Sequence, residues 1–336
     1  MKPRIALTMG DPNGIGPEIL VKTLADPSWR DRCSPLVIGD LAILSDTSAV
    51  VGADLTFRPA EAAYEASGNE IVVLQPEELK LPPVRWGQLD AAMGEAAAVC
   101  LRTALRLGMA GQVDGFVAAP LNKQAFHLAG YGYLDELAFF ADITGSPRPC
   151  FMGVIGDILT VSVTEHIAFK DILANLTTEN VLWYIRQMHS ALGKAHTSRH
   201  RIGVAALNPH AGEGGLLGTE EIDLIVPAIE AARAAGMVVD GPVPADVIFP
   251  RALHGDFDGI VCMYHDQANI GRKLQPSETG ATVYMGLPIV GTTTAHGTAF
   301  DIAGRGVADP GSFCAALDTA ISFARQGARH QPTKSM

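Results

Sequence analysis

Short runs of apolar and β-branched residues alternate along the chain with longer segments in which apolar residues recur every three to four positions. The short runs predict buried strands, and the longer segments predict amphipathic helices. We expect strands at Arg4–Met9, Pro35–Gly39, Glu70–Leu74, Gly115–Ala118, Ile158–Val163, Ile202–Ala206 and Gly259–Met263. We expect helices at Gln88–Gly108, Glu179–Leu192, Thr219–Ala235 and Gly311–Gln326.

This alternation predicts an α/β fold with a largely parallel sheet, in which ligands usually bind beyond the carboxyl ends of the strands. The 336 residues are enough for about two domains. No repeat or low-complexity linker separates them, so we expect crossovers of the sheet to join the domains. The polar segment Arg329–Met336 has no pattern, and we expect a frayed tail there.

The composition favours a globular protein with a large core, because 48% of the residues are hydrophobic and only 18% are charged. With 25 Lys and Arg against 36 Asp and Glu, the net charge of −11 would repel nucleic acid and anionic membranes. An anionic substrate must therefore be captured by a local positive site. The first apolar run, Ile5–Met9, is too short for a signal peptide or a membrane span, so we expect a cytoplasmic protein.

The five cysteines argue against a disulfide framework and a cysteine-ligated zinc site. They are odd in number, widely spaced, and never form a Cys-x-x-Cys pair. We expect them to be small buried hydrophobic residues.

A first glycine-rich segment, MGDPNGIGPE at residues 9–18, follows the first strand and opens a helix. Pro17 suits the first helical position, and Glu18 suits the first turn. The segment is compatible with two interpretations, an anion or nucleotide cradle of backbone N–H groups or a tight strand-to-helix turn. It does not match the Gly-x-Gly-x-x-Gly pattern of the common dinucleotide-binding fold.

A second glycine-rich segment, HGTAFDIAGRG at residues 296–306, resembles the adenosine-binding loop of isopropylmalate and isocitrate dehydrogenases. The resemblance implies that the loop wraps the adenine end of the cofactor, and its expected cofactor-binding residues are His296, Gly297, Thr298, Ala299 and Asp301. Glycines allow close approach of the backbone to a flat base. The Asp301 carboxylate can accept the ribose hydroxyls and repel a 2′-phosphate, which favours NAD over NADP. The alternative is a surface connection.

Three histidines, His166, His210 and His265, each follow a predicted strand. Three imidazoles could hold a divalent metal and leave a coordination position open for substrate. No local spacing rule connects the three, and each taken singly is equally typical of a hydrogen-bonded histidine at the end of a strand.

Several motifs taken together resemble the 4-hydroxythreonine-4-phosphate dehydrogenase family. They are MGDPNGIGPE, PLNK at residues 120–123, NPHAGE at 208–213, PAD at 244–246, YHDQ at 264–267 and the loop from His296. The resemblance implies a homodimer of the isopropylmalate-dehydrogenase-like fold with two α/β/α domains and an active site in the cleft at the dimer interface. It also implies NAD(P)-dependent oxidation of a secondary alcohol and loss of CO₂ from the resulting 3-oxo acid. The same resemblance implies a divalent metal (Zn, Mn, Co or Mg) held by three histidines contributed across the dimer interface, which match His166, His210 and His265.

The same resemblance predicts the domains and further catalytic residues. We expect residues 1–128 with 286–336 to form a domain carrying the cofactor loop, and 129–285 a domain carrying the metal ligands and dimer contacts. Asp246 and Asp266 are candidates for proton transfer or for orienting a ligating histidine, and the alternative is a loop-capping carboxylate. Lys273 matches a substrate-binding lysine, although a lone lysine is usually solvated.

The chain departs from the family where the family binds its substrate. A His-Thr pair is replaced by Glu136 and Leu137, an asparagine by Thr282, and an arginine by Gly291. These changes remove much of the grip on a phosphate, because bidentate arginine contacts are hard to replace. We therefore expect a non-phosphorylated anionic substrate held by Glu136, Lys273 and Thr282, for example a cis-dihydrodiol carboxylate of the terephthalate type, oxidised with decarboxylation.

Other functions are compatible with the sequence. The first alternative is a dehydrogenase for 4-hydroxythreonine-4-phosphate or a four-carbon sugar-acid phosphate. A phosphate acyltransferase could share the architecture, and a protein that binds metal or nucleotide without catalysis is a further class.

Overall fold

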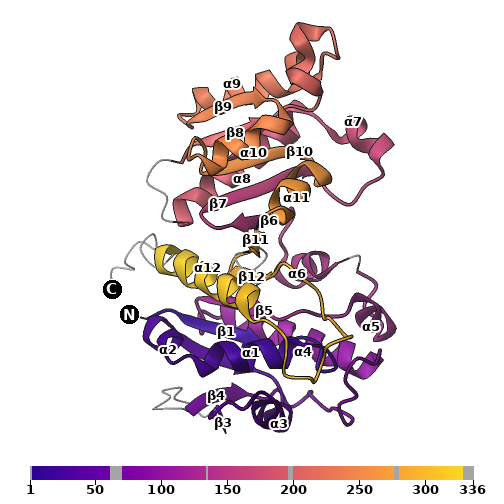
Figure 1. Ribbon diagram of the computed structural model, residues 1–336, viewed down its shortest axis with the longest axis vertical. Coiled ribbons are helices and arrows are strands. Elements are labelled where there is room, and N and C mark those ends of the chain that lie inside the picture. Colours follow the sequence, from indigo (N-terminus) through magenta and orange to yellow (C-terminus); the bar gives the residue numbers. More distant parts are fainter. Residues whose placement is uncertain (1, 61–69, 134, 196–199, 276–279, 328–336) are drawn as a thin grey trace. The chain divides into compact units, whose positions relative to one another are not determined.

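A computed structural model describes residues 2–60, 70–133, 135–195, 200–275 and 280–327 (Figure 1). The described residues up to Cys150, together with those from Ala281 onward, form one compact unit, and Phe151–Gly280 form a second. The division between these two units falls at other residues than the domain boundaries expected from the sequence. Those expected boundaries stay a prediction. The tail predicted at Arg329–Met336 lies outside the described residues.

The sheet of the first unit is parallel except at one edge. Its strand order is β3 (Thr56–Pro59), β4 (Glu70–Leu74), β2 (Ser34–Ile38), β1 (Arg4–Thr8), β5 (Gly115–Ala118), β12 (Val290–Thr294) and β11 (Gly280–Met285). β11 pairs with β12 in the antiparallel sense, whereas β12 pairs with β5 in the parallel sense. The inner strands β1 and β5 are almost wholly buried, as expected for strands covered on both faces.

Seven helices are described in the first unit: α1 (Gly16–Ala25), α2 (Ser28–Arg32), α3 (Leu41–Val51), α4 (Ala91–Met109), α5 (Lys123–Leu128), α6 (Glu136–Thr144) and α12 (Gly311–Gly327). Aspartate or asparagine side chains cap several of them; Asp135, for example, accepts a hydrogen bond from the Ala138 N–H at 2.9 Å at the start of α6. α4 packs on β1 and β5, and α12 packs on β5 and β12.

The second unit has the strand order β6 (Cys150–Ile155), β7 (Ile158–Thr164), β10 (Gly259–Tyr264), β8 (Ile202–Ala205) and β9 (Val239–Val243). Its α-helices are α7 (Ile172–Asn175), α8 (Thr178–Lys194), α9 (Val226–Ala234), α10 (Ala245–Leu253) and α11 (His265–Lys273). Short helical turns cover Phe169–Asp171, Pro209–Gly215 and Glu221–Ile225. Only the β6–β7 pair is antiparallel among the strand pairs described in this unit.

Side-chain alternation along β10 shows that helices cover both faces of the second sheet. A Cβ on Gly259 would lie 2.4 Å from Sδ of Met188 on α8. The next residue, Ile260, belongs to an apolar cluster with Ile248 of α10 and Ala268 of α11. Because neighbouring residues of a strand point to opposite faces, α8 covers one face and α10 with α11 cover the other.

The structure confirms the α/β class, and it confirms each predicted strand and helix to within about three residues. Helical structure over the predicted segment 219–235 begins with a π-turn before α9. Strands β3, β6, β9, β11 and β12 were not predicted. The predicted burial of the cysteines is confirmed for four of the five, and Cys314 is half-buried. Burial raises the pKa of the Cys33 and Cys100 thiols to about 12, so neither is a reactive thiolate.

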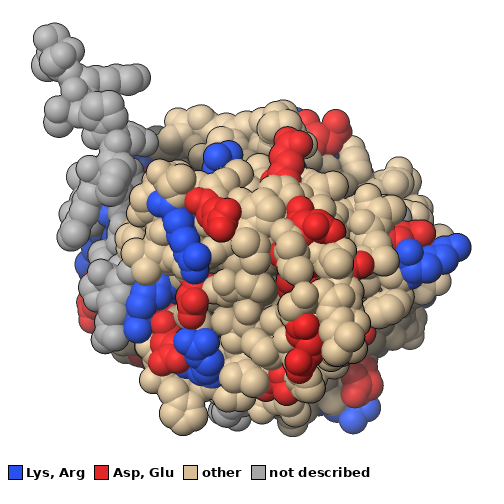
Figure 2. All heavy atoms as spheres, turned by 90° about the horizontal axis from the view of Figure 1, so that it is seen from above, with Lys and Arg blue, Asp and Glu red and all other residues tan. Residues whose placement is uncertain are grey.

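None of the described helices is long and apolar enough to cross a membrane. Figure 2 shows one face of the molecule, on which acidic and basic side chains are interspersed among broad uncharged areas. That face carries no continuous basic field of the kind that binds nucleic acid.

Candidate functional site

The predicted adenosine loop leaves β12 at its carboxyl end and is tied to the first unit by its backbone. Thr294 donates its hydroxyl to the His296 carbonyl at 2.9 Å, and the Ile15 N–H donates to the Thr298 carbonyl at 3.0 Å. The loop turns through a left-handed conformation at Ala299 (φ +41°) and at Gly304 (φ +75°). These turns give the segment a defined path.

A buried ion pair on α1 fixes the far end of this loop. Glu18 is 1% exposed, and its carboxylate accepts hydrogen bonds from the Ala308 N–H at 2.6 Å and the Gly306 N–H at 3.3 Å. Lys22 lies 3.0 Å from Glu18 and donates to the carbonyls of the same two loop residues. Charge-assisted hydrogen bonds of this kind are among the stronger ones, so the pair acts as a clamp on the loop.

The loop fits a nucleotide. His296, Gly297 and Asp301 are exposed, and nothing lies within 4 Å of a Cβ built on Gly297. The backbone at Gly297 is therefore open to a flat base, and the Asp301 carboxylate is open to ribose hydroxyls.

The glycine-rich turn after β1 uses its N–H groups internally. The Asn13 N–H donates to the Asp11 carboxylate at 2.9 Å, and the Gly14 N–H donates to the Asp11 carbonyl at 3.0 Å. A Cβ on Gly14 would lie 2.9 Å from the Thr298 Cβ, so glycine is needed for the turn to pack on the adenosine loop. Of the two interpretations of this segment, the geometry favours the tight turn.

Asp11 is fully buried in this turn. Burial raises the pKa of its carboxyl to about 6, with the hydrogen bond from Asn13 acting in the opposite direction. Within the described residues, its Oδ2 has no hydrogen-bond partner. A buried carboxyl with one unsatisfied oxygen favours the protonated form.

In the second unit, the register of two parallel strands brings two of the predicted metal ligands together. Thr164 of β7 pairs with Tyr264 of β10, so the residues that follow them leave the sheet side by side. His166 and His265 have ring centroids 5.5 Å apart. Glu165 joins them, because one ligand atom from each of the three residues lies within 4.8 Å of the others.

The surroundings of this cluster suit a divalent cation. His265 Nδ1 lies 2.7 Å from Oδ1 of Asp266, an arrangement that orients the ring and leaves Nε2 for a metal. Burial raises the pKa of the Glu165 carboxyl, and a hydrogen bond from Ser162 together with the charges of the two histidines and Arg272 opposes that rise. Two imidazoles and a carboxylate form a common donor set for Zn²⁺ and related ions.

His210 lies after β8 in a loop of unusual backbone. His210, Ala211 and Glu213 have positive φ angles of 52°, 55° and 48°. Such angles cost about 1–2 kcal/mol for each non-glycine residue and recur at functional sites. His210 Nδ1 lies 2.9 Å from the Glu213 carboxylate, and its side chain is 70% exposed. The described cluster does not include His210, so its role as a ligand stays a prediction.

A buried carboxylate anchors the start of the His210 loop. Glu221 is 2% exposed and accepts hydrogen bonds from the N–H groups of Leu207 at 2.9 Å and Asn208 at 2.7 Å. The Asn208 amide also donates to Glu221 and to Glu220. Because these bonds hold the two residues that precede Pro209, they fix where the loop leaves the sheet.

The remaining predicted residues are distributed over both units. Asp246 is exposed in the first turn of α10, and Lys273 is exposed at the end of α11. In the first unit, Glu136 begins α6 and accepts a hydrogen bond from the Tyr284 hydroxyl at 3.4 Å. Thr282 lies on β11, two residues before that tyrosine. Their roles in catalysis and substrate binding stay predictions.

Gly291 occupies a tight position in the first unit. A Cβ there would lie 2.5 Å from the Phe116 ring and 3.0 Å from the Tyr284 ring, which are stacked with centroids 6.0 Å apart. The aromatic pair therefore leaves no space for a side chain at position 291.

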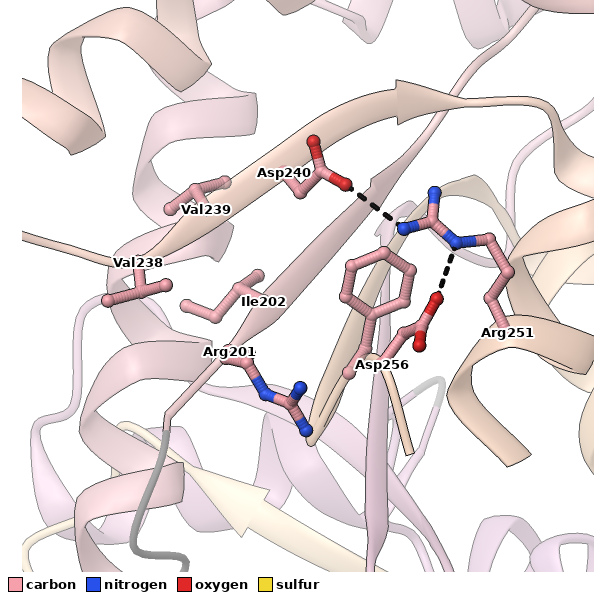
Figure 3. A pocket seen from close by; sticks show the side chains of 8 residues that line it. Arg201, Ile202, Val238, Val239, Asp240, Arg251 and Asp256 are labelled. Carbon is pink, nitrogen blue, oxygen red and sulfur yellow. Dashed lines mark hydrogen bonds and ion pairs between the residues drawn. The ribbon is translucent and has the colours of Figure 1, made fainter. Parts of the chain in front are cut away.

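A cavity of about 310 Å³ lies at the amino ends of β8 and β9, at the opposite edge of the second sheet from the histidines (Figure 3). Arg251 points into it and is paired with Asp240 at 3.3 Å and Asp256 at 2.8 Å. Arg201 is paired with Asp258 at 3.7 Å. Because these charges are already matched, the cavity is a poor site for an anionic substrate.

The fold and the two candidate sites suit a class, the nucleotide-dependent dehydrogenases that use a divalent metal. Residues 31–320 match the family described as pyridoxal phosphate biosynthetic protein PdxA, and the chain belongs to this family. It is accordingly an oxidoreductase that acts on CH–OH groups. Membership implies NAD(P) and a divalent metal as cofactors.

Relatives cover nearly the whole chain. A D-threonate 4-phosphate dehydrogenase from Cupriavidus necator is 41% identical over 97% of this chain and 96% of its own length. A 4-hydroxythreonine-4-phosphate dehydrogenase structure from Klebsiella pneumoniae is 35% identical, covers 96% of this chain and 98% of that one, and has a TM-score of 0.83. A terephthalate 1,2-cis-dihydrodiol dehydrogenase from Burkholderia xenovorans is 32% identical with the same coverages and a TM-score of 0.69.

These comparisons correct one expectation and reveal what sequence reasoning missed. They do not support a non-phosphorylated substrate with decarboxylation, because phosphorylated four-carbon substrates appear in the names of the more similar relatives. Glu18, Lys22, Glu165 and Glu221 were not predicted as site residues. Glu165 was visible beside His166, and only the strand register shows that it also lies near His265.

Proposed function

We propose that this chain oxidises the secondary alcohol of a four-carbon hydroxy acid phosphorylated at C4, with NAD as the hydride acceptor. D-threonate 4-phosphate and 4-hydroxythreonine-4-phosphate are the two candidate substrates. The observation that carries the proposal is the similarity of the whole chain to dehydrogenases named for these compounds. We further propose that His166, His265 and His210 hold the divalent cation.

Each of the chain's own residues has a defined part in this proposal. A bound divalent cation would polarise the substrate alcohol so that it loses its proton more easily. Asp266 orients His265 through the 2.7 Å contact, and Asp246 is a candidate for accepting the alcohol proton. Asp301 accepts the ribose hydroxyls and disfavours the 2′-phosphate of NADP, which is why we propose NAD.

Lys273 is the proposed positive group for the substrate phosphate or carboxylate. It shares helix α11 with His265 and lies eight residues further along, about 12 Å along the helix axis. Helical side chains lean toward the amino end, so the long Lys273 side chain shortens this distance toward the histidines. That separation suits an extended four-carbon substrate with its alcohol at one end and its phosphate at the other.

The test is NADH formation with each candidate acid in the presence of Zn²⁺, Mn²⁺, Co²⁺ or Mg²⁺. We expect turnover of D-threonate 4-phosphate or 4-hydroxythreonine-4-phosphate, and loss of turnover after chelation of the metal. Faster oxidation of the terephthalate cis-dihydrodiol than of both phosphates would contradict the proposal. The family resemblance also underlies the expectation of a homodimer, which light scattering on the purified protein tests.

A further inference from the structure

A tryptophan that belongs to none of the motifs described above packs directly on the adenosine loop. We propose that Trp86 is a positioning residue of the nucleotide site. It holds the turn that carries Asp301, and it thereby sets both the affinity for the nucleotide and the preference between NAD and NADP. The inference rests on the proposed function only in taking the adenosine loop to bind the nucleotide.

The contact between Trp86 and the loop is made on the face of the indole ring. A Cβ built on Gly304 would lie 2.4 Å from Cγ, 2.6 Å from Cδ1 and 2.7 Å from Cδ2 of Trp86. Because these three ring atoms are almost equally far from that point, the Gly304 backbone packs on the flat face of the ring. Gly304 also has a φ of +75°, so the backbone conformation and the indole ring both require glycine at this position.

A buried asparagine of the first glycine-rich turn holds the segment that carries this tryptophan. Asn13 is fully buried, and its side-chain amide donates to the Gln88 carbonyl at 2.8 Å. Its side-chain oxygen accepts a hydrogen bond from the Arg85 N–H at 2.8 Å, and its main-chain carbonyl accepts one from the Gly87 N–H at 2.8 Å. These three bonds to one residue fix residues 85–88, so the indole ring has a defined position.

The same segment contacts the loop at a second point, and the two points lie on either side of Asp301. A Cβ built on Gly87 would lie 2.5 Å from the carbonyl oxygen of Phe300, the residue directly before Asp301. Gly304, which packs on the indole ring, lies three residues after Asp301. The backbone that carries the carboxylate is therefore supported before and after it.

Asp301 takes its position from this backbone. The Ile302 N–H donates to the Ala299 carbonyl at 3.1 Å, and the Arg305 N–H donates to the Ile302 carbonyl at 3.3 Å, so the chain turns twice around this point. The Asp301 side chain is exposed and makes no hydrogen bond or ion pair to the residues that the structure describes. The position of its carboxylate thus follows the turn that Trp86 supports.

Support of this kind acts on affinity by lowering the cost of ordering the loop. A loop that is already in its bound conformation loses less entropy when the nucleotide binds. Discrimination between NAD and NADP depends in addition on the distance from the Asp301 carboxylate to the 2′ position, because repulsion between like charges falls with distance. Loss of the indole ring should therefore weaken nucleotide binding and bring the two affinities closer together.

The test measures nucleotide binding directly, without substrate or metal. NADH and NADPH are titrated separately, and the change in nicotinamide fluorescence gives each Kd. We expect Trp86→Ala to weaken NADH binding at least about tenfold and to reduce the ratio between the two affinities at least about threefold. Trp86→Phe keeps a flat ring and should stay within about threefold of the wild type in both respects.

Trp29→Ala is the matched control for a general loss of stability in the same unit. Trp29 lies on α2 and is 8% exposed, and the Arg32 guanidinium lies 4.7 Å from the centre of its ring. This truncation should lower the unfolding temperature and leave both Kd values within about twofold of the wild type. Trp86→Leu and Trp29→Leu remove less volume and repeat the comparison if an alanine variant does not fold.

A second experiment tests the contact between the ring and the loop. Gly304→Ala places a methyl group against the indole ring and should weaken NADH binding at least about tenfold. In the double variant with Trp86→Ala the ring is absent, so the two losses should not add. The double variant should bind NADH no more weakly than Gly304→Ala alone.

Unchanged Kd values in Trp86→Ala, or an equal weakening of both nucleotides, would overturn the inference. Additive losses in the double variant, or a Trp86→Phe variant as impaired as Trp86→Ala, would also overturn it. If Trp86→Ala shows both expected changes while the wild type oxidises neither phosphorylated acid, the positioning role stands and the proposed function fails. If the wild type oxidises one of these acids with NAD and Trp86→Ala binds both nucleotides normally, the proposed function stands and the inference fails.

Discussion

The adenosine loop and the histidine cluster both follow the carboxyl ends of strands, but they are built in different ways. The loop is held by buried groups that bond its backbone, and its exposed residues include His296, Gly297 and Asp301. The cluster offers partly exposed side chains, and nearby charges set their positions. A nucleotide is recognised by shape, which requires a fixed backbone, whereas a cation is recognised by charge and donor atoms.

Two carboxylates make this contrast concrete. Glu18 is fully buried and satisfied by two backbone N–H groups and Lys22, so it has no capacity left for a ligand. Glu165 faces two imidazoles and remains partly exposed. Substitutions in the loop region should therefore change nucleotide affinity or stability, and substitutions in the cluster should remove chemistry.

The largest effect is expected for His265→Ala. Loss of this proposed metal ligand should lower kcat about 10³-fold, because a metal contributes several kcal/mol of transition-state stabilisation. Nucleotide binding, measured by NADH fluorescence, should stay unchanged if the two regions act separately. His254→Ala, an exposed histidine bonded to the Pro250 carbonyl, is the control and should keep full activity. Equal losses in both variants would contradict the assignment.

Asp11→Asn tests the buried turn beside the loop. The folded protein, with a pKa of about 6 at Asp11, binds a proton that the unfolded chain loses near its ordinary pKa of 3.8. Wild-type stability therefore falls as the pH rises from about 4 to about 6 and stays lower above that range. At pH 7 the asparagine variant should be more stable by up to about 3 kcal/mol, and at pH 4 the difference should vanish.

Urea unfolding of the wild type and Asp11→Asn at both pH values measures this difference. Asp46→Asn, on the exposed side of α3, should show no such dependence. A wild type that is more stable than Asp11→Asn at pH 7 would show that the ionised carboxylate has a partner in solution.

Asp301→Asn tests whether the loop also discriminates between nucleotides by charge. Removing the carboxylate should raise the ratio of kcat/KM for NADP to that for NAD at least about tenfold, because like-charge repulsion of the 2′-phosphate disappears. Steady-state kinetics with both nucleotides gives the ratio. No change in the ratio would mean that the loop recognises the nucleotide by shape alone.

Glu18→Gln should have the smallest effect. Weakening the clamp should raise KM for the nucleotide about fivefold and leave kcat within about twofold, since a hydrogen bond to a charged group contributes about 1.5–3 kcal/mol and the amide keeps part of it. Glu95→Gln, on α4, is the control. Co²⁺ affinity should be identical in the wild type, Glu18→Gln and Glu95→Gln. A lower affinity in Glu18→Gln alone would show that the adenosine loop and the histidine cluster are coupled.

Much of the fold could be predicted because the strands that carry the sites are short, apolar and β-branched. β7 and β10 were predicted, and so was the position of a histidine after each. Strands β6 and β12 were missed; β12 has a single large apolar residue, Val290, so the apolar pattern there is weak.

The site was less predictable, because its contacts join residues far apart in the sequence. Glu18 reaches N–H groups almost 290 positions away, and no local pattern encodes that contact. Glu165 stands beside His166 in the sequence, but its proximity to His265 follows only from the strand register. The left-handed backbone conformation of His210 could not be predicted for another reason. Non-glycine residues rarely adopt this conformation, so the sequence gives no sign of it.

The contact between Gly291 and Phe116 has a consequence for how this chain could change its specificity. An arginine introduced at position 291 meets an aromatic ring at its first side-chain atom, so the single substitution should destabilise the protein before it contributes any charge. If Phe116 is replaced by a smaller residue first, space opens for the arginine. The core then contains a cavity until the arginine substitution is also made. The two changes are therefore epistatic: each is harmful alone, and a mutational path between the two states must pass through a less stable intermediate.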